Sequence, residues 1–414
     1  MMSKKSPQLR FEGFTDDWEE RKLGDLATSF EYGLNASAKS FDGTHKYIRI
    51  TDIDDSSRKF NSQSLTSPDI DLSSADNYKL KNGDILFART GASVGKSYIY
   101  ADSDGLVYYA GFLIRARIKS GVDSNFVFQH TLTSSYENFI RVTSQRSGQP
   151  GVNAKEYSTF EINVPSYEEQ RKIGSFFKQL DDTITLHQRK IDLLKEQKKG
   201  YLQKMFPKNG AKVPELRFAG FADDWEERKL GRIGETFTGL SGKTKEDFGH
   251  GDAKFVTYVN VFENPISNPN KTERVEIDEK QNQIKYGDVF FTTSSETPEE
   301  VGMSSVWLDN TENIYLNSFC FGYRPTTELD SYYLAFMLRS PSIRKKFMFL
   351  AQGISRYNIS KTKVMELEVP VPEIDEQKKV GSFFKTLDDT IALHQRKLDL
   401  LKEQKKGFLQ KMFV

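Results

Sequence analysis

The sequence predicts an α+β protein: two mixed α/β domains in a pseudo-two-fold arrangement, separated by two long antiparallel coiled-coil helices. Two internal repeats lead to this prediction. The stretch Glu169–Phe206 returns as Glu376–Phe413 with six changes in 38 positions, and Pro7–Gly24 returns as Pro214–Gly231 with three changes in 18. Both repeats have a spacing of 207 residues, so the 414 residues form two halves of equal length.

The longer repeat has the pattern of a long helix. Its apolar residues recur at alternating steps of four and three, a period near 3.5 that is typical of a coiled-coil seam. Ser166 and Glu169 have capping-box spacing at its start, and such a helix is about 55 Å long. Each helix is apolar along one side, so we expect the two to pack on each other. The predicted seam consists of Ile173, Phe177, Leu180, Ile184, His187, Ile191 and Leu194 in the first helix and Val380, Phe384, Leu387, Ile391, His394, Leu398 and Leu401 in the second.

Two histidines of this seam, His187 and His394, occupy equivalent positions near the middle of their helices. In an antiparallel pair, residues near the midpoint approach their own equivalents, so we expect the two imidazoles within about one heptad layer of each other. A polar residue at one core position can fix the register of a coiled coil at a cost in stability. The alternative is that two partly exposed histidines were duplicated with the rest of the repeat.

The chain divides into four predicted segments. Residues 1–167 form the first domain, 168–206 the first helix, 207–374 a linker with the second domain, and 375–414 the second helix. Between the repeats the halves diverge, apart from scattered similarities such as a Gly-Asp pair in each. Short apolar runs with Gly and Asn between them predict strands, and longer patterns predict helices. The predicted strands include 47–50, 84–87, 112–116, 255–259 and 288–291, and the predicted helices lie near 126–142 and 331–350.

Composition limits the class of protein. A hydrophobic content of 37% with 13% aromatic residues is ample for globular cores, and 414 residues exceed a single core. A lone cysteine, Cys320, excludes a disulfide framework and a cysteine-based zinc site. The beginning of the sequence lacks an apolar signal segment and no run approaches a membrane span, so we expect a cytoplasmic protein. The net charge of +1 requires any anion-binding surface to be local.

The contrast between the repeats and the domains suggests a function. Near-identical repeats suggest two copies of one partner, and divergent domains suggest a different ligand for each. A rod that holds two dissimilar domains a fixed distance apart suits a long regular ligand, of which duplex DNA is the obvious example. The alternative is a symmetric coiled-coil adaptor that bridges two copies of a partner protein without nucleic acid. Salt-sensitive, specific DNA binding would separate the two hypotheses.

The order of these motifs resembles the specificity subunit of type I restriction–modification systems, over the entire chain. The motifs are Trp18 with Leu23-Gly24, Trp225 with Leu230-Gly231, and the helices from Glu169-Gln170 and Glu376-Gln377. The resemblance implies two target-recognition domains, each of which recognises one half of a bipartite, asymmetric DNA site. It also implies that the helices act as a ruler and dock two methyltransferase subunits, which restriction–translocase subunits join.

The chain offers no convincing chemistry of its own. Gly91–Ser97 resembles a phosphate-binding loop, but Thr90 stands where the first glycine belongs. No Asn-Pro-Pro-aromatic motif of an amino-methyltransferase is present, and the five histidines lack metal-ligand spacing. We therefore expect no catalytic residue, metal or cofactor in this chain. S-adenosylmethionine, ATP and Mg are expected on the partner subunits.

Two loops in each half have the chemistry to contact DNA. One follows the strand that begins with the Gly-Asp pair, and the other precedes the long helix. Lys, Arg and hydroxyl side chains suit phosphates, and Arg, Asn and Gln suit base edges. Solvated polar turns are the alternative for any single residue. The candidates are Arg89, Thr90, Ser93, Lys96, Arg146, Ser147 and Gln149 in the first half and Thr292, Thr293, Ser294, Ser295, Gln352, Arg356, Tyr357 and Asn358 in the second.

Overall fold

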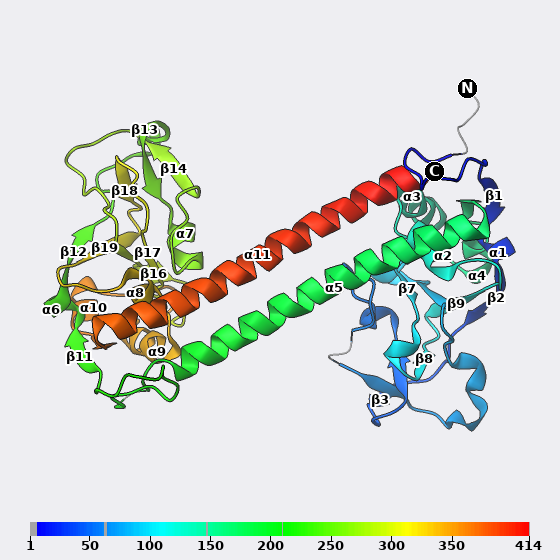
Figure 1. The fold of residues 1–414 in the computed structure, drawn as a ribbon, viewed down its shortest axis with the longest axis horizontal. Coiled ribbons are helices and arrows are strands. Elements are labelled where there is room, and N and C mark those ends of the chain that lie inside the picture. Colours follow the sequence, from blue (N-terminus) through cyan, green and yellow to red (C-terminus); the bar gives the residue numbers. More distant parts are fainter. Residues whose placement is uncertain (1–5, 62–63, 146–147, 209, 414) are drawn as a thin grey trace. The chain divides into compact units, whose positions relative to one another are not determined.

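The computed structural model describes residues 6–61, 64–145, 148–208 and 210–413, which separate into two compact units. The first unit contains Met1–Arg189 and Gln395–Val414, and the second contains Lys190–His394. Each unit therefore combines the domain of one half of the chain with parts of both long helices. In Figure 1 the red end of helix α11 belongs to the unit that holds the blue and cyan strands.

The first unit is built around an antiparallel sheet with the strand order β2-β9-β6-β7. The central strand β6 (Ile85–Ala88) is buried along its whole length, because its two faces lie in different apolar clusters. Ile85 and Phe87 pack toward the helices, and Leu86 and Ala88 pack toward the short strands. The other strands of the unit are β1 (Glu19–Lys22), β2 (Ala27–Tyr32), β3 (Ala38–Ser40), β4 (Lys46–Ile48), β5 (Thr66–Pro68), β7 (Ser97–Ile99), β8 (Val107–Tyr109), β9 (Leu113–Ile118) and β10 (Glu161–Val164).

The second unit repeats this plan with the order β12-β19-β15-β17. Its central strand β15 (Val289–Thr292) is again fully buried. A three-stranded sheet, β14-β13-β18, takes the place of the short paired strands of the first unit. The other strands are β11 (Glu226–Lys229), β12 (Gly234–Thr238), β13 (Phe248–Val256), β14 (Thr272–Val275), β16 (Ser294–Ser295), β17 (Ser304–Val306), β18 (Ile314–Leu316), β19 (Cys320–Pro325), β20 (Tyr357–Asn358) and β21 (Glu368–Val371).

The predicted strands at 47–50, 84–87, 112–116 and 288–291 correspond to β4, β6, β9 and β15 within one or two residues. The run 255–259 is different, because β13 ends at Val256 and helix α7 begins at Tyr258. Thr257 separates the two elements, and its side chain accepts a hydrogen bond from the Asn260 N–H at 3.2 Å. This cap starts a helix where β-branched and aromatic residues predicted a longer strand.

Each of the two predicted short helices is in fact two helices, so the predictions near 126–142 and 331–350 were wrong as single helices. The first divides into α2 (Ser124–His130) and α3 (Ser134–Thr143), since Thr133 caps α3 with its hydroxyl. The second divides into α8 (Ser331–Met337) and α9 (Pro341–Leu350), since proline lacks an N–H and suits the first turn. The remaining short helices are α1 (Leu23–Leu26), α4 (Ala154–Tyr157), α6 (Leu230–Ile233), α7 (Tyr258–Glu263) and α10 (Lys361–Met365), with 3₁₀ turns at Ile50–Asp52, Leu72–Ser74, Asp76–Tyr78, Gly91–Ser93, Asp102–Asp104 and Lys245–Asp247.

The two long helices are α5 (Tyr167–Lys204) and α11 (Ile374–Met412), as the heptad pattern predicted. In the first unit the rings of Phe176 and Phe408 lie 5.1 Å apart. In the second unit the rings of Tyr201 and Phe383 lie 5.0 Å apart. In both units the end of one helix contacts the beginning of the other, so the helix segments inside each unit run antiparallel.

The predicted seam residues differ in burial. His187 belongs to the first unit and His394 to the second, so the predicted proximity of their imidazoles remains a prediction. Ile173 and Phe177 pack into the core of the first domain, and Val380 and Phe384 pack into that of the second. The domain cores therefore include the ends of the helices. Ile173, Phe177, Ile191, Leu194, Val380, Phe384, Leu398 and Leu401 are buried, and Leu180, Ile184, His187, Leu387, Ile391 and His394 are half-buried.

Two smaller expectations concern the cysteine and the membrane. Cys320 is buried, and burial raises the pKa of its thiol, so it packs as a small apolar group. Among the described residues, no helix combines the length and the apolar character that crossing a membrane requires.

Candidate nucleic-acid interface

Each long helix is anchored to its domain by a buried ion pair. The Arg10 guanidinium donates two hydrogen bonds, of 2.7 and 2.8 Å, to the Glu169 carboxylate. Arg217 makes the same two bonds, with the same lengths, to Glu376. Both glutamates are buried, and a bidentate arginine fixes the orientation of a carboxylate as well as its charge. This pairing sets the position of each helix start relative to its domain.

The residue after each glutamate extends the anchor to the helix that covers the sheet. Gln170 donates to the Pro165 carbonyl at 2.9 Å and accepts from the Asp123 N–H at 3.1 Å. Asp123 in turn caps α2 by accepting from the Phe126 N–H. A Cβ atom at Gly174 would lie 2.1 Å from Asp123, so this close approach requires glycine. The second domain repeats the arrangement with Gln377, Pro372, Asp330, Tyr333 and Gly381.

On this framework the first domain brings its two predicted loops together. The loop after β6 pairs with the loop before α4, through a bridge between Thr90 and Gly151. The Gly91 N–H donates to the Pro150 carbonyl at 3.0 Å, and the Val152 N–H donates to the Arg89 carbonyl at 2.9 Å. The two candidate loops therefore form one paired surface, although about 60 residues separate them in the sequence.

The second domain joins its own two loops in the same way. Strand β16, directly after β15, pairs with β20 through Ser294 and Asn358. The Ile359 N–H donates to the Thr293 carbonyl at 3.0 Å, and Gln352 bridges to Asn358. We call these two surfaces the paired loops: residues 89–96 with 144–145 and 148–152, and residues 292–295 with 352–359.

The candidate side chains of the paired loops differ in accessibility. Lys96 lies 2.5 Å from Asp55, so its ammonium already has an acidic partner within the same domain. Arg146 and Ser147 lie outside the described residues. Exposed candidates are Gln149, Gln352, Arg356 and Asn358, and half-buried candidates are Arg89, Thr90, Ser93, Lys96, Thr293 and Tyr357.

Three candidates of the second domain lie inside it. Thr292, Ser294 and Ser295 are buried. The Thr292 hydroxyl accepts from the Met303 N–H at 3.0 Å, and the Ser295 hydroxyl donates to the Thr297 carbonyl. The Thr292 and Ser295 hydroxyl groups thus hold the loop in shape, because a buried polar group needs a partner inside the protein. Burial leaves these three side chains little access to a ligand.

Sequence reasoning missed an aromatic residue beside each pair of loops. Phe112 is 56% exposed and Phe319 is 59% exposed, and the two are 207 residues apart. The Phe112 carbonyl accepts from the Arg89 N–H at 3.0 Å, and the Phe319 carbonyl accepts from the Thr293 N–H at 3.0 Å. The signal was present in the sequence, since phenylalanine recurs at the repeat spacing inside a region that otherwise diverges.

The segment that resembles a phosphate-binding loop has a different structure. Gly91–Ser93 form a 3₁₀ turn, and the chain continues into strand β7 at Ser97. A phosphate-binding loop leads into a helix whose N-terminus faces the phosphate. The segment instead belongs to the paired loops of the first domain.

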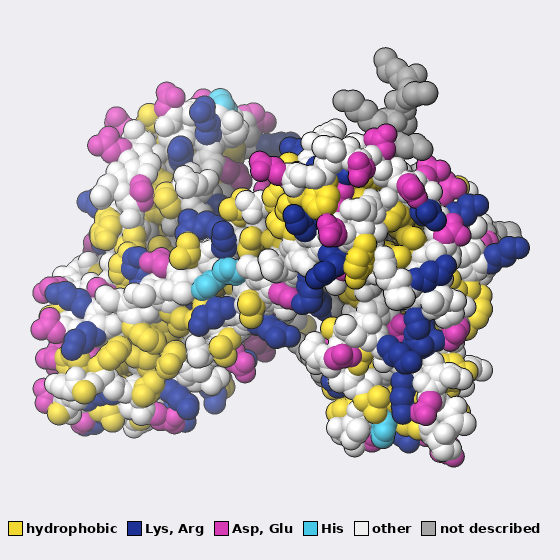
Figure 2. Space-filling model, turned by 45° about the vertical axis from the view of Figure 1, so that its right-hand side comes forward, with side chains coloured by type: hydrophobic (Ala, Val, Ile, Leu, Met, Phe, Trp, Pro, Cys, Tyr) yellow, Lys and Arg dark blue, Asp and Glu magenta, His cyan; other side chains and the backbone are white. Residues whose placement is uncertain are grey.

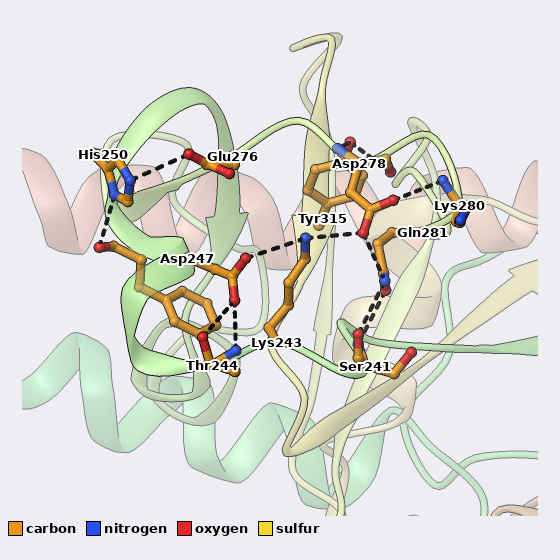
Figure 3. Close-up of polar contacts among 11 residues, drawn as sticks. Ser241, Lys243, Thr244, Asp247, His250, Glu276, Asp278, Lys280, Gln281 and Tyr315 are labelled. Atoms are coloured by element: carbon orange, nitrogen blue, oxygen red, sulfur yellow. Dashed lines mark hydrogen bonds and ion pairs between the residues drawn. The ribbon is translucent and has the colours of Figure 1, made fainter.

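A polar cluster on the three-stranded sheet of the second unit is held together by internal hydrogen bonds and ion pairs (Figure 3). Lys243 lies 2.9 Å from Asp278 and 3.8 Å from Asp247, and His250 lies 3.3 Å from Glu276. The Lys243 ammonium is the main reason that the pKa of Asp278 is lowered to about 2. Across the described ranges, no group of three or more His, Cys, Asp or Glu side chains is placed to hold a metal. The cluster links the segment before β13, which contains Lys243, to the segment after β14, which contains Asp278.

The face drawn in Figure 2 carries charges of both signs. Lys, Arg, Asp and Glu side chains all occur over each unit on this face, and some Lys and Arg side chains lie next to one another. This agrees with the net charge of +1.

Comparison with known proteins points to one family. The model for the type I restriction modification DNA specificity domain matches twice, at residues 15–196 and 222–403. A putative type I restriction enzyme MjaX specificity subunit from Methanocaldococcus jannaschii is 24% identical over 415 residues, covering 95% of this chain and 92% of the relative. The MjaVIII specificity subunit of the same organism is 19% identical over 427 residues, covering 95% and 91%.

Solved structures share the fold. The S subunit of a type I restriction–modification system from M. genitalium aligns with a TM-score of 0.65 at 14% identity, covering 99% of each chain. A chain from a study of complex assembly and conformational transition of the type I R-M system aligns with a TM-score of 0.51 at 17% identity, covering 95% of this chain and 97% of that one. At these identities the likeness concerns the fold alone.

Proposed function

This chain belongs to the type I restriction–modification DNA specificity family, and from that membership we propose that it selects a bipartite, asymmetric DNA site. Each domain recognises one half of the site through its paired loops. The observation that carries the proposal is a duplicated framework around loops that differ. Arg10–Glu169 and Arg217–Glu376 have the same geometry, whereas the loops they position present different side chains.

The differences between the loops are of the kind that changes base preference. The first domain offers Arg89 and Gln149, and the second offers Thr293, Arg356 and Asn358. Arginine prefers guanine, and asparagine or glutamine prefers adenine, because their donors and acceptors match those base edges. Two domains with different sets of these residues recognise different sequences, which makes the complete site asymmetric.

The repeats dock two copies of one partner, which we propose is the methyltransferase subunit, with the restriction subunits joining them. Leu186 and Leu393, 207 residues apart, are both exposed on their helices. Leu193 and Leu400 form a second exposed pair with the same spacing. Exposed leucines at equivalent positions give each half of the chain the same apolar contact, as two identical partners require.

In this proposal the chain binds and its partners catalyse. S-adenosylmethionine, ATP and Mg belong to the methyltransferase and restriction subunits. A subunit that directs them to the chromosome works in the cytoplasm.

Base-modification sequencing of host DNA, with and without this gene, tests the proposal. We expect loss of adenine methylation at one gapped, asymmetric motif, which reveals both half-sites at once. An unchanged methylation pattern in a host whose methyltransferase subunit is present and active would overturn the proposal and favour the adaptor hypothesis.

A substitution in one domain tests the division of labour. Arg356→Ala should relax one base of the second half-site, at a cost of about 1–3 kcal/mol, and leave the first half-site unchanged. The measurement is methylation of a library of variant sites by the assembled complex. An equal loss on unrelated DNA would show that Arg356 contacts only phosphate.

A further inference from the structure

In the first domain, Arg89 lies against two aromatic rings. The centre of its guanidinium is 5.0 Å from the ring of Tyr32, at the end of β2, and 5.7 Å from the ring of Phe112, just before β9. Both rings are more than one-third exposed. The cluster therefore lies at the surface, where the loop after β6 leaves the sheet.

Among the described residues, no acidic side chain forms an ion pair with the Arg89 guanidinium. Within the described part of the chain, its side chain makes no hydrogen bond or ion pair, and its Nε is buried without a partner. Lys96 in the same loop differs, since Asp55 is its acidic partner. An arginine held at the surface with unused donors has the chemistry of a ligand-binding group.

The aromatic contacts restrict the guanidinium and so favour a ligand with two adjacent hydrogen-bond acceptors. Stacking on ring faces restricts a planar guanidinium, so it loses less freedom when it forms a pair of parallel hydrogen bonds. In the major groove of DNA, guanine presents two adjacent acceptors, O6 and N7, whereas adenine presents one acceptor beside a donor. A restricted arginine with free donors therefore favours guanine over the other bases.

The second domain places other residues at the equivalent positions. In the first domain, Tyr32 pairs with Ile114 across the sheet. The second domain's equivalent of Ile114 is Phe321, which pairs with Thr238. The backbone N–H of Arg89 donates to the Phe112 carbonyl. At the equivalent Phe319, the donor is the backbone N–H of Thr293. Threonines thus replace both the ring and the guanidinium, while the exposed phenylalanine remains.

We propose that Arg89, held against Tyr32 and Phe112, recognises the major-groove edge of a guanine in the half-site of the first domain. The inference rests on the proposed function, because it names a base within a DNA site. It makes Arg89 a specificity-determining residue and Tyr32 a positioning residue.

The test uses the full chain assembled with its methyltransferase subunits on a library of randomised sites, read by sequencing of methylated bases. The wild-type complex should require guanine at one position of the first half-site. Arg89→Ala should remove that preference, with about a 10- to 100-fold loss on the preferred site, and leave the second half-site unchanged. Thr293→Ala, the matched variant of the second domain, should leave the first half-site unchanged.

Two variants of Tyr32 separate stacking from a structural role. Tyr32→Phe keeps the ring and removes the hydroxyl that accepts from the Ala154 N–H at 3.2 Å, so guanine preference should persist. Tyr32→Leu removes the ring and should weaken the preference at the same base as Arg89→Ala does. Thermal unfolding of each variant verifies that the chain is folded.

Two outcomes would overturn guanine recognition by Arg89 but leave the proposed selection of a DNA site intact. A uniform loss on all sequences with Arg89→Ala would make Arg89 a phosphate contact, and a wild-type first half-site without a required guanine would also refute it. Failure of the proposed function looks different, since the wild-type complex would then show no sequence preference that depends on this chain.

Discussion

The two domains share the anchors of their long helices and differ in the side chains of their paired loops. The anchors at Glu169 and Glu376 have the same partners and the same bond lengths. The paired loops occupy the same places, yet Arg89 in one domain stands where Thr293 stands in the other. This contrast shows that the position of the loops does not depend on their side chains. The side chains can therefore change while the anchors keep the loops in place.

The frameworks also differ in two buried details. The Trp225 Nε1–H donates to the Glu376 carboxylate at 2.9 Å, whereas the Trp18 Nε1–H is buried without a partner. His130 ends α2 in the first domain, and Met337 ends α8 in the second. These differences predict that equivalent substitutions have unequal effects.

The largest expected effect concerns the aromatic residue after each long helix. Phe206 follows α5 but packs in the core of the second domain, against Trp225, Tyr333 and Phe384. Phe206→Ala should therefore lower the free energy of unfolding by about 3–5 kcal/mol. Hydrogen exchange should place the loss in the second unit. The equivalent Phe413→Ala should cost less and act on the first unit, because Phe413 is 9% exposed and Phe206 2%.

The next effect compares the two anchors. Arg10→Met leaves the buried Glu169 carboxylate unpaired and should cost about 3 kcal/mol of unfolding free energy. Arg217→Met should cost about 1 kcal/mol less, since Trp225 still donates to Glu376. Urea unfolding at neutral pH measures both. Equal costs would mean that the tryptophan bond contributes nothing.

A smaller effect depends on pH and on His130. This imidazole is buried against the Phe126 and Phe413 rings, and burial lowers its pKa from 6.5 to about 3. Between these values the unfolded chain binds a proton that the folded chain does not, so stability falls as the pH falls. The loss at pH 5 should be about 2 kcal/mol relative to pH 8.

His130→Met copies the residue of the second domain and serves as the control. Methionine does not titrate, so the variant should lose less stability than the wild type between pH 8 and pH 5. Urea midpoints at the two pH values provide the comparison. A wild-type chain that is equally stable at both would contradict the prediction.

The smallest effect concerns the polar cluster of Figure 3, in the second unit. The pKa of Asp278 is lowered to about 2, chiefly by Lys243. The carboxylate therefore stabilises the fold above pH 3.8, and this contribution is lost as the pH falls toward 2. Lys243→Gln should reduce the dependence on pH, as measured by melting temperature at pH 5 and pH 3. An unchanged difference would show that the hydrogen bonds from Lys280 and Gln281 suffice.

Much of the fold followed from periodicity. The heptad pattern predicted α5 and α11, and short apolar runs predicted β6, β9 and β15. The failures are local, at Thr133, Thr257 and Pro341, where one residue ended or started a helix inside an apolar pattern. A side-chain cap and a missing N–H act over a single turn, and apolar periodicity averages over several.

The candidate site was predicted as four loops, and the structure joins them into two surfaces. The bridge between Thr90 and Gly151, and that between Ser294 and Asn358, connect residues about 60 apart. The burial of Thr292 and the contact of Arg89 with Tyr32 depend on these pairings. Sequence order alone does not reveal which of several polar side chains such a pairing leaves accessible.

The sequence by itself determined the duplication, the two long helices and the family, because repeats and heptads are properties of residue order. The tertiary structure decided which domain each helix end completes, which loops pair, and that Lys96 has an acidic partner whereas Arg89 lies against aromatic rings. These depend on contacts between residues far apart in the chain, whose free energy comes from burial and geometry that no local pattern records.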